Sequence, residues 1–426
     1  MTNTQINDKI LELANYLKID NKCVAHNARL QSIQINGAVI KNFSFKLFNE
    51  YKLSFFNCKF LCEINEAPGF FEIENPVYIY GCTFEENVIS YNIKFKSNVV
   101  IAYCRFNKNF YFEANTFCNS SNFERNFYNY ASFKKSHFEK NVTFYNSTFK
   151  GLDFSQAIFN ENLNIVNTKL NFTFSNLEEK IEQEYEEFNK NKKEEDQKSL
   201  DKFANDFRDS FRTFKNALIK DNNLLDASNF HKYELYCKEI ELKNKKYKTL
   251  KDKMDKWQLI FYRKLCDHHT DILQSLNSLI LVIGIFVISS VAMVFGFNYS
   301  LGYKPILEHW YFSLDFYNHH INSIIQDNYL FMMAINIMIL FIYLGLIGFA
   351  LCLKYMRKFF IIISYAITLS VLVVSPKILI PAMGFFTDKR AILDPLSAIG
   401  GIYTIVFGFV VFSFIKTIRK NSIVPS

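Results

Sequence analysis

The stretch that decides the fold is residues 133–159, FKKSHFEKNVTFYNSTFKGLDFSQAIF. A phenylalanine recurs in it every five or six positions, at Phe133, Phe138, Phe144, Phe149, Phe154 and Phe159. An α-helix repeats its buried face every 3.6 residues and a strand every 2, so this spacing fits neither element. A five-residue step therefore indicates a repeat of a different kind.

The same spacing of large apolar residues extends over much of the N-terminal part of the chain. It begins faintly at Leu30, Ile35, Ile40 and Phe45 and resumes at Phe55 and Phe60. We predict that the clearest rungs form an inward structural ladder: Phe84, Ile89, Phe95, Ile101, Phe106, Phe112, Phe117, Phe123, Phe133, Phe138, Phe144, Phe149, Phe154, Phe159, Ile165 and Leu170.

The residue two positions before each large one is usually small. Examples are Ala131 before Phe133 and Ser147 before Phe149, and cysteine takes this place at Cys58, Cys82 and Cys104. One small and one large inward residue per five fits a coil of square section, in which each five-residue segment forms one side. Stacked coils then pair backbone to backbone at the ordinary interstrand spacing of ~4.8 Å.

This pattern resembles the pentapeptide-repeat proteins, in particular the phenylalanine-rich, membrane-anchored bacterial form. The resemblance implies a right-handed quadrilateral β-helix with four repeats per coil. Leucine-rich and hexapeptide solenoids are the alternatives, but neither keeps a five-residue step through Phe144, Phe149, Phe154 and Phe159. Ala67-Pro68-Gly69 and Pro76 interrupt the repeat and predict a loop.

Changes in composition divide the chain into four predicted parts. Residues 1–20 hold a short amphipathic helix with Ile10, Leu13, Ala14 and Leu17 on one face, which would cap the open end of the solenoid. The β-helix is expected over 21–176. A charged helical connector, ending in a basic juxtamembrane helix, is expected over 177–271, and a membrane domain over 272–426.

Within the connector, apolar spacing predicts two helices joined at Asp221-Asn222-Asn223 as an antiparallel hairpin. The hairpin resembles a stretch of membrane-anchored pentapeptide-repeat proteins in its sequence pattern. The residues that carry this resemblance are Phe211, Arg212, Phe214, Lys215, Ala227, Phe230 and Glu234. Arg212, Lys215 and Glu234 form either a ligand or partner site or, as we favour, ion pairs that bridge the two helices.

Residues 243–271 are strongly basic and include an apolar face of Trp257, Ile260, Phe261 and Leu265. A basic amphipathic helix beside a membrane span favours a position along an anionic lipid surface. The residues predicted to contact the membrane surface are Lys251, Lys253, Lys256, Trp257, Arg263 and Lys264. Nucleic-acid binding is the alternative, but the adjacent span makes it the less economical one.

Four long segments without charged residues predict membrane spans at about 276–297, 329–353, 359–381 and 396–416. One set of flanks carries fifteen Lys and Arg and the other carries four, so the positive-inside rule places both termini in the cytoplasm. No cleavable signal is recognised, and a bacterial inner membrane is expected. Small residues such as Gly345, Gly348, Gly400 and Gly401 are expected to pack helices together.

Chemistry-bearing motifs are missing from the sequence. It has no phosphate loop, no nucleophile elbow, no His-Glu-x-x-His and no cysteine spacing suited to zinc, so we expect neither an enzyme nor a cofactor or metal. The predicted spans lack ionisable residues at mid-depth, which counts against ion-coupled transport. In the outer loop 304–327, His319 and His320 belong to a re-entrant element, a metal pair or, as we favour, an interfacial aromatic belt.

The charge of the repeats excludes one activity that the family resemblance implies, namely the imitation of DNA. Between Phe84 and Ser175 there are ten Lys and Arg against seven Asp and Glu, so the rod cannot imitate polyanionic DNA. We therefore expect a non-enzymatic membrane scaffold or sensor that binds a protein partner, without nucleic acid. The alternative is an oligomeric channel gated by the rod, and a homo-oligomer is compatible with either function. A membrane-acting effector is a third, weaker hypothesis.

Overall fold

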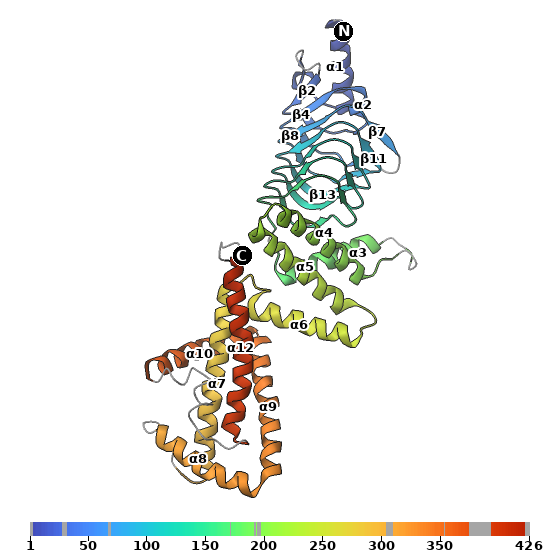
Figure 1. The fold of residues 1–426 in the computed structure, drawn as a ribbon. Helices are drawn as coiled ribbons and strands as arrows, with labels where there is room; N and C mark the ends of the chain where they lie inside the picture. Colours follow the sequence, from blue (N-terminus) through green and yellow to red (C-terminus); the bar gives the residue numbers. More distant parts are fainter. Residues whose placement is uncertain are drawn as a thin grey trace. The chain divides into compact units, whose positions relative to one another are not determined.

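A computed structural model describes residues 3–27, 32–66, 70–170, 172–190, 193, 197–303, 310–352, 354–374 and 393–421. The chain forms two compact units, residues 1–256 and 257–426. The first unit is a β-solenoid followed by helices, and the second is entirely helical in its described residues (Figure 1). Leu30 and the segment 67–69, both named in the sequence predictions, lie outside the described residues.

The solenoid is built from short strands in three sheets. The first sheet, called sheet A, contains β1 (Val24–Asn27), β2 (Ser32–Asn36), β4 (Leu53–Phe56), β8 (Val77–Tyr80), β12 (Val99–Ala102), β15 (Ser121–Asn122), β18 (Val142–Thr143) and β22 (Leu163–Asn164). The second contains β3 (Val39–Ile40), β5 (Lys59–Phe60), β6 (Ile64–Glu66), β9 (Thr83–Phe84), β10 (Val88–Tyr91), β13 (Arg105–Glu113), β16 (Phe127–Ser132), β19 (Thr148–Phe149) and β20 (Leu152–Asp153). The third contains β7 (Phe71–Ile73), β11 (Ile93–Phe95), β14 (Thr116–Phe117), β17 (His137–Phe138) and β21 (Ile158–Phe159).

Strand register shows how much chain each turn uses. In sheet A the successive partners are Ile33–Leu53, Ser54–Tyr78, Val77–Val99, Val99–Ser121, Ser121–Val142 and Val142–Leu163, so a turn takes 20 to 24 residues. These pairs span about six turns and are parallel, whereas β1 pairs with β2 antiparallel. A turn of this length accommodates four five-residue segments, as the repeat predicts.

The inward side chains stack ring on ring along the axis. Phe106 lies between Phe84 and Tyr128, with ring centroids 4.7 and 5.0 Å away, and Tyr128 lies 4.9 Å from Phe149. These distances match the spacing of adjacent strands, because each ring rests on its equivalent in the next coil. Tyr128 is fully buried and occupies a rung that the predicted ladder lacks.

Most of the predicted ladder is buried in the solenoid core. The buried members are Phe84, Phe95, Ile101, Phe106, Phe112, Phe117, Phe123, Phe133, Phe138, Phe144, Phe149, Phe154 and Ile165, while Phe159 and Leu170 are partly buried in the last coil. Ile89 is a correction, because its side chain is only half-buried and its neighbours Val88 and Ser90 point inward instead. Adjacent residues of a strand face opposite sides, so the prediction was one position out of register here.

The small inward position also makes hydrogen bonds between coils. The backbone N–H of Cys104 donates to Oδ1 of Asn126 at 2.7 Å, and the N–H of Asn126 donates to Oγ of Ser147 at 3.2 Å. Nδ2 of Asn126 also donates to the buried Tyr128 hydroxyl at 2.8 Å. Because a buried polar group is costly unless it is hydrogen-bonded, these links fix how each coil sits on the next.

Helices cover both ends of the solenoid. At the N-terminal end, helix α1 (Asn3–Leu17) buries Leu13, Ala14 and Leu17 against the core, followed by the 3₁₀ turn η1 (Asn21–Cys23). The short helix α2 (Leu47–Glu50) lies within the first coils. At the C-terminal end, helices α3 (Phe174–Asn189), α4 (Leu200–Lys220) and α5 (Leu224–Asn244) follow the last coil, and Oγ of Ser210 accepts a hydrogen bond from the N–H of Phe154 at 2.7 Å.

The second unit contains the apolar helices, and α6 (Leu250–Cys266) leads into it. Its other helices are α7 (Ile272–Ser300), α8 (Trp310–Asp327), α9 (Tyr329–Cys352), α10 (Lys354–Val374) and α12 (Pro395–Asn421). By length and composition, the described residues offer three candidate membrane spans: Ile272–Ser300, Tyr329–Leu351 and Pro395–Arg419. The predicted span 359–381 falls partly on α10 and partly, from residue 375, outside the described residues.

A close helix crossing in this unit lies at a glycine that the sequence did not single out. A Cβ on Gly284 of α7 would lie 2.2 Å from Oγ of Ser364 in α10, so only glycine permits this approach. A Cβ on Gly345, Gly348, Gly400 or Gly401 would meet nothing within 4 Å. The expectation that those four glycines pack helices together is therefore wrong within the described residues, because their faces point into open space.

Replacing a central ring tests the stacked core. We expect Phe133→Ala to destabilise the solenoid by about 3–5 kcal/mol, because Phe133 is fully buried among neighbouring rings and its loss leaves a cavity. Thermal proteolysis of the full chain measures the change. The control is Ile158→Ala, at a side chain that is 55% exposed, where we expect less than about 0.5 kcal/mol. Equal effects of the two substitutions would contradict the packing.

Candidate functional site: the hairpin, helix α6 and the outer face of sheet A

The predicted hairpin residues lie together between α4 and α5. Phe211, Phe214, Ala227 and Phe230 are buried, and the Phe214 ring lies 4.8 Å from Phe154 of the last coil. The apolar face of the hairpin therefore packs on the end of the solenoid.

The charged hairpin residues form a bridge centred on Glu234. Its Oε1 accepts a hydrogen bond from Nε of Arg212 at 3.0 Å, and its Oε2 accepts one from Nζ of Lys215 at 2.7 Å. Nδ1 of His231 lies 3.3 Å from the same Oε2. Glu234 is on α5 and both cations are on α4, so these contacts are ion pairs across the hairpin.

Two opposing effects set the pKa of Glu234. Burial raises it, but hydrogen bonds from His231, Lys215 and Arg212 outweigh burial and lower the pKa from 4.5 to about 2. The carboxylate is therefore ionised throughout the neutral range and already holds its cations. This arrangement fits a bridge that stabilises the hairpin, whereas a role in ligand or partner binding stays a prediction.

Helix α6 exposes one continuous apolar row. Leu250, Met254, Trp257 and Phe261 are 79, 73, 69 and 40% exposed, and their spacing of four, three and four residues places them on one helical face. This face differs from the predicted one, because Leu265 is fully buried, in a core cluster that also contains residues of α7, α9 and α12.

Of the predicted membrane-surface residues, Lys251, Lys253 and Trp257 are exposed, while Lys256, Arg263 and Lys264 are half-buried. The backbone carbonyls of Arg263 and Lys264 accept hydrogen bonds from Nε2 of Gln274 at 2.7 and 2.9 Å. These two residues therefore join α6 to α7. The exposed part of α6 combines an apolar row with flanking lysines, which is the composition of a helix that lies on a lipid surface.

Sheet A has an outer face that differs from the rest of the solenoid. None of its eight strands contains a lysine, arginine, aspartate or glutamate. Elsewhere, outward lysines pair with glutamates, as Lys140 does with Glu161 at 2.8 Å and Lys96 with Glu74 at 2.7 Å. The strands of sheet A therefore present an outer face without charged side chains.

Aromatic side chains line one edge of this face. Phe56 and Tyr80 have ring centroids 6.4 Å apart, and Tyr80 and Tyr103 have centroids 4.6 Å apart. The guanidinium of Arg125 lies 5.0 Å above the Tyr103 ring, and its Nη1 donates to the Tyr103 hydroxyl at 2.5 Å. We call Phe56, Tyr80, Tyr103 and Arg125 the aromatic row. Tyrosine and arginine are the residues on which protein interfaces most often depend.

Comparison with known families agrees with this architecture. Residues 126–169 match the family model described as pentapeptide repeats (9 copies). The chain therefore carries a pentapeptide-repeat solenoid. Comparison with curated proteins and with solved structures gave no match.

The uncharged face and the aromatic row were not predicted from the sequence. The available signal was the outward residue of every fourth repeat, because residues one turn apart lie on the same face. A single count of charges over all the repeats does not reveal that one face carries no charged residue in its strands. Within the described ranges, no three His, Cys, Asp or Glu residues gather where they could hold a metal ion.

The low pKa of Glu234 gives a prediction about pH. A carboxyl whose pKa is lowered on folding adds stability above its unfolded value, and this stability is lost as the pH falls towards the folded value. We expect Glu234→Gln to destabilise the first unit by about 1–2 kcal/mol at pH 7, and the difference from the wild type to shrink between pH 5 and about 2. Melting temperatures across this range measure the effect.

The matched control is Glu63→Gln, at an exposed glutamate outside the hairpin. We expect this substitution to leave the pH profile of the melting temperature unchanged. A Glu234 variant as stable as the wild type at pH 7 would show that the bridge does not stabilise the hairpin.

Proposed function

We propose that the protein is a non-enzymatic membrane-anchored scaffold or sensor, and that its solenoid binds a protein partner through the outer face of sheet A. The observation that carries this proposal is the segregation of charge on the solenoid, with an uncharged sheet face beside faces that hold ion pairs. Interface cores are depleted in charge and enriched in tyrosine and arginine, which matches this face and its aromatic row.

The same segregation of charge supports a protein partner over a nucleic acid. A nucleic acid needs a run of unpaired cations along the backbone it binds, and sheet A supplies none in its strands. A rigid sheet of short strands also presents its side chains at fixed spacing, so a partner would bind it without an ordering cost on the solenoid side.

We further propose four membrane crossings. The start of α12 lies near the end of α7, since Leu396 and Val294 share one cluster with Tyr317 of α8. The end of α9 lies instead near the start of α7, where Leu351 and Leu281 share another cluster. We propose that the fourth crossing runs over about 359–381, of which α10 supplies the described part.

The finer points of the architecture follow from this proposal. Both termini would be cytoplasmic in a bacterial inner membrane, as the basic flanks favour, and α6 would lie along the inner lipid surface. The pairing of β13 with β9 and β10, and of β16 with β19 and β20, supports a coil with four sides, and the proposal takes this coil to be right-handed. The division of the chain into four parts, with boundaries after residues 20, 176 and 271, belongs to the same proposal.

One observation favours the alternative of an oligomeric channel. Gly345, Gly348, Gly400 and Gly401 face open space on α9 and α12, where helices of another copy could approach closely. Native mass spectrometry in detergent tests the channel, since a monomer with few, uncharged spans has little room for a conducting path, whereas an oligomer is compatible with either function.

The fourth crossing predicts where the chain lies on either side of the membrane. We expect an impermeant thiol reagent outside intact cells to label Thr387→Cys above the wild-type background, and to label Ser426→Cys only after the cells are opened. Mass shifts of the full chain report the labelling. Equal access to both positions from outside would contradict the four-span topology.

The docking face predicts position-dependent crosslinking. A photo-reactive amino acid placed at residue 78, 80 or 103 of the full chain in cells should crosslink to the same protein, which mass spectrometry identifies. With the photo-reactive residue at 78 or 80, Arg125→Ala should reduce that crosslinking by about tenfold, because the guanidinium lies over the Tyr103 ring.

The matched control position is residue 91, where Tyr91 is equally exposed but belongs to a different sheet. We expect no common partner from that position. If every position captures only a second copy of this chain, the face is a dimer interface and the scaffold proposal fails.

A further inference from the structure

One side of the solenoid carries cations that no carboxylate neutralises. In the second sheet, strand register places the following residues in one outward column: Thr83, Arg105, Phe127, Thr148 and Lys169. Lys150 follows Thr148 by two positions and therefore lies on the same side. Arg105, Lys150 and Lys169 are exposed, and none of them forms an ion pair among the described residues. We call these three cations, together with Phe127, the basic face.

The Phe127 ring lies beneath two of these cations. Its centroid is 4.4 Å from the guanidinium of Arg105 and 5.4 Å from the ammonium of Lys150, and a cation over an aromatic ring is attracted to it. Elsewhere on the solenoid an outward lysine pairs with a glutamate one coil away, as Lys140 does with Glu161 at 2.8 Å. The basic face therefore presents cations that the chain positions but does not neutralise.

Helix α3 of the same chain carries the opposite charge. Glu179, Glu182 and Glu186 are spaced by three and four residues, which places them in one stripe along the helix. All three are exposed, and none forms an ion pair within the described part of the chain. By contrast, the buried Glu184 of this helix pairs with Lys180 at 3.0 Å. We call Glu179, Glu182 and Glu186 the acidic stripe.

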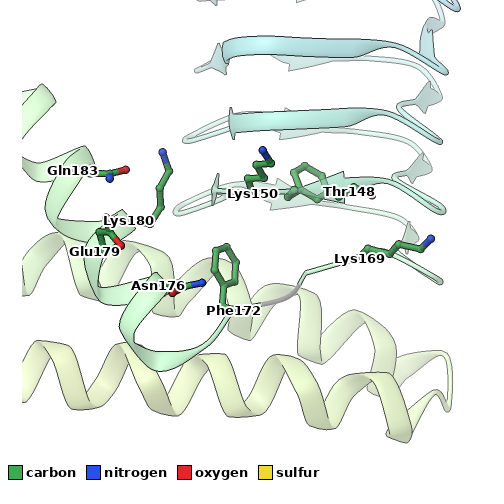
Figure 2. A pocket seen from close by; sticks show the side chains of 9 residues that line it. Thr148, Lys150, Lys169, Phe172, Asn176, Glu179, Lys180 and Gln183 are labelled. Carbon is green, nitrogen blue, oxygen red and sulfur yellow. The ribbon is translucent and has the colours of Figure 1, made fainter.

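The acidic stripe lies level with the basic face along the solenoid. Near its start α3 packs on the last coils, since a Cβ on Gly151 would lie 2.7 Å from Cε of Lys180. One turn later, burial and the charge of Glu184 raise the pKa of Tyr111, which lies two coils nearer the N-terminus. Figure 2 shows α3 beside the strands of the last coils, one of which carries Lys150. The helix therefore runs back along the coils that hold the basic face.

We propose that the basic face binds the acidic stripe of a second copy of the chain. Three exposed carboxylates face three exposed cations, and among the described residues no ion pair joins the two surfaces within one chain. Their lengths also match, because three strand spacings separate Arg105 from Lys169, ~14 Å, and seven helical residues separate Glu179 from Glu186, ~10 Å. Sheet A takes no part in this contact, so the inference goes beyond the proposed function.

The contact joins two different surfaces, so it is heterologous. Each copy keeps one free basic face and one free acidic stripe after pairing, and further copies can add until a ring closes or a row forms. Because ion pairs at a surface contribute little individually and are screened by salt, the association is weak and salt-dependent. Anchoring copies in one membrane raises their effective concentration and compensates for the low affinity.

The test is sedimentation of the purified full chain in non-ionic detergent, free of nucleic acid and anionic lipid. We expect association at about 50 mM salt that weakens at least about tenfold at about 500 mM salt. Arg105→Glu combined with Lys150→Glu should abolish this salt-dependent association, and so should Glu182→Lys combined with Glu186→Lys. An equal mixture of the two double variants should restore it, because each then offers the charge that the other lost.

The matched control is Lys135→Glu combined with Lys140→Glu, which changes the net charge equally at exposed positions outside the basic face. We expect it to alter the dissociation constant by less than about twofold. Melting temperatures establish that the variants fold.

Four results would overturn the proposal. The first is no salt-dependent association of the wild type at about 100 μM. The second is association that the two double variants leave unchanged, which would assign it to the membrane helices. The third is a mixture of the double variants that stays unassociated. The fourth is association only after an oligonucleotide or an anionic phospholipid is added, which would assign the basic face to a polyanion.

Discussion

Ring-on-ring packing along the solenoid axis is the interaction on which the rest of the first unit depends. Each inward ring is buried by its equivalents one coil before and one coil after, as Phe117 is by Phe95 and Phe138 at 5.0 and 4.6 Å. This stacking distance is also the distance at which parallel strands pair, so side chains and backbone impose the same rise. A coil at either end has lost one neighbour, which explains why helices α1 and α4 bury apolar faces there.

Because the core uses only the inward positions, the outward positions are free to differ from face to face. On the other two sheets they form ion pairs between coils, as Lys94 of β11 does with Glu72 of β7 and Lys108 of β13 does with Glu86, and the partners of each pair are 22 residues apart in sequence. These separations equal one turn of the solenoid. On sheet A the outward strand positions carry no charge, and tyrosine, asparagine and threonine supply polar groups there without ion pairs.

The sequence alone was sufficient to predict the coil, because its large residues recur at a period that neither a helix nor a single strand explains. The prediction failed at positions where a polar residue occupies an inward site. A ladder of phenylalanine and aliphatic residues leaves out Tyr128, yet the hydroxyl of Tyr128 accepts a hydrogen bond from Asn126 and its ring stacks on Phe106 like the other inward rings. Ile89 was misplaced because Ser90, a small polar residue, occupies the large inward position. The bridge at Glu234 was predicted from charge and spacing, whereas the pair of Lys134 with Asp206 joins residues whose proximity depends on how the hairpin packs on the solenoid.

A solenoid of this construction favours a scaffold over a gate. Gating requires an element with two arrangements of similar free energy, which a signal then biases. The coils here are joined by backbone pairing, stacked rings and hydrogen bonds from buried side chains such as Asn126, and a close-packed core of this kind resists gradual deformation. The hairpin is attached to Phe154 of the last coil by Ser210, and to the coil before it by the pair of Lys134 with Asp206 at 3.2 Å. A partner bound to sheet A would therefore be held by one rigid body that extends from the first coil to α5. The fold can control where the partner lies relative to this body, but not through a change of shape within the body.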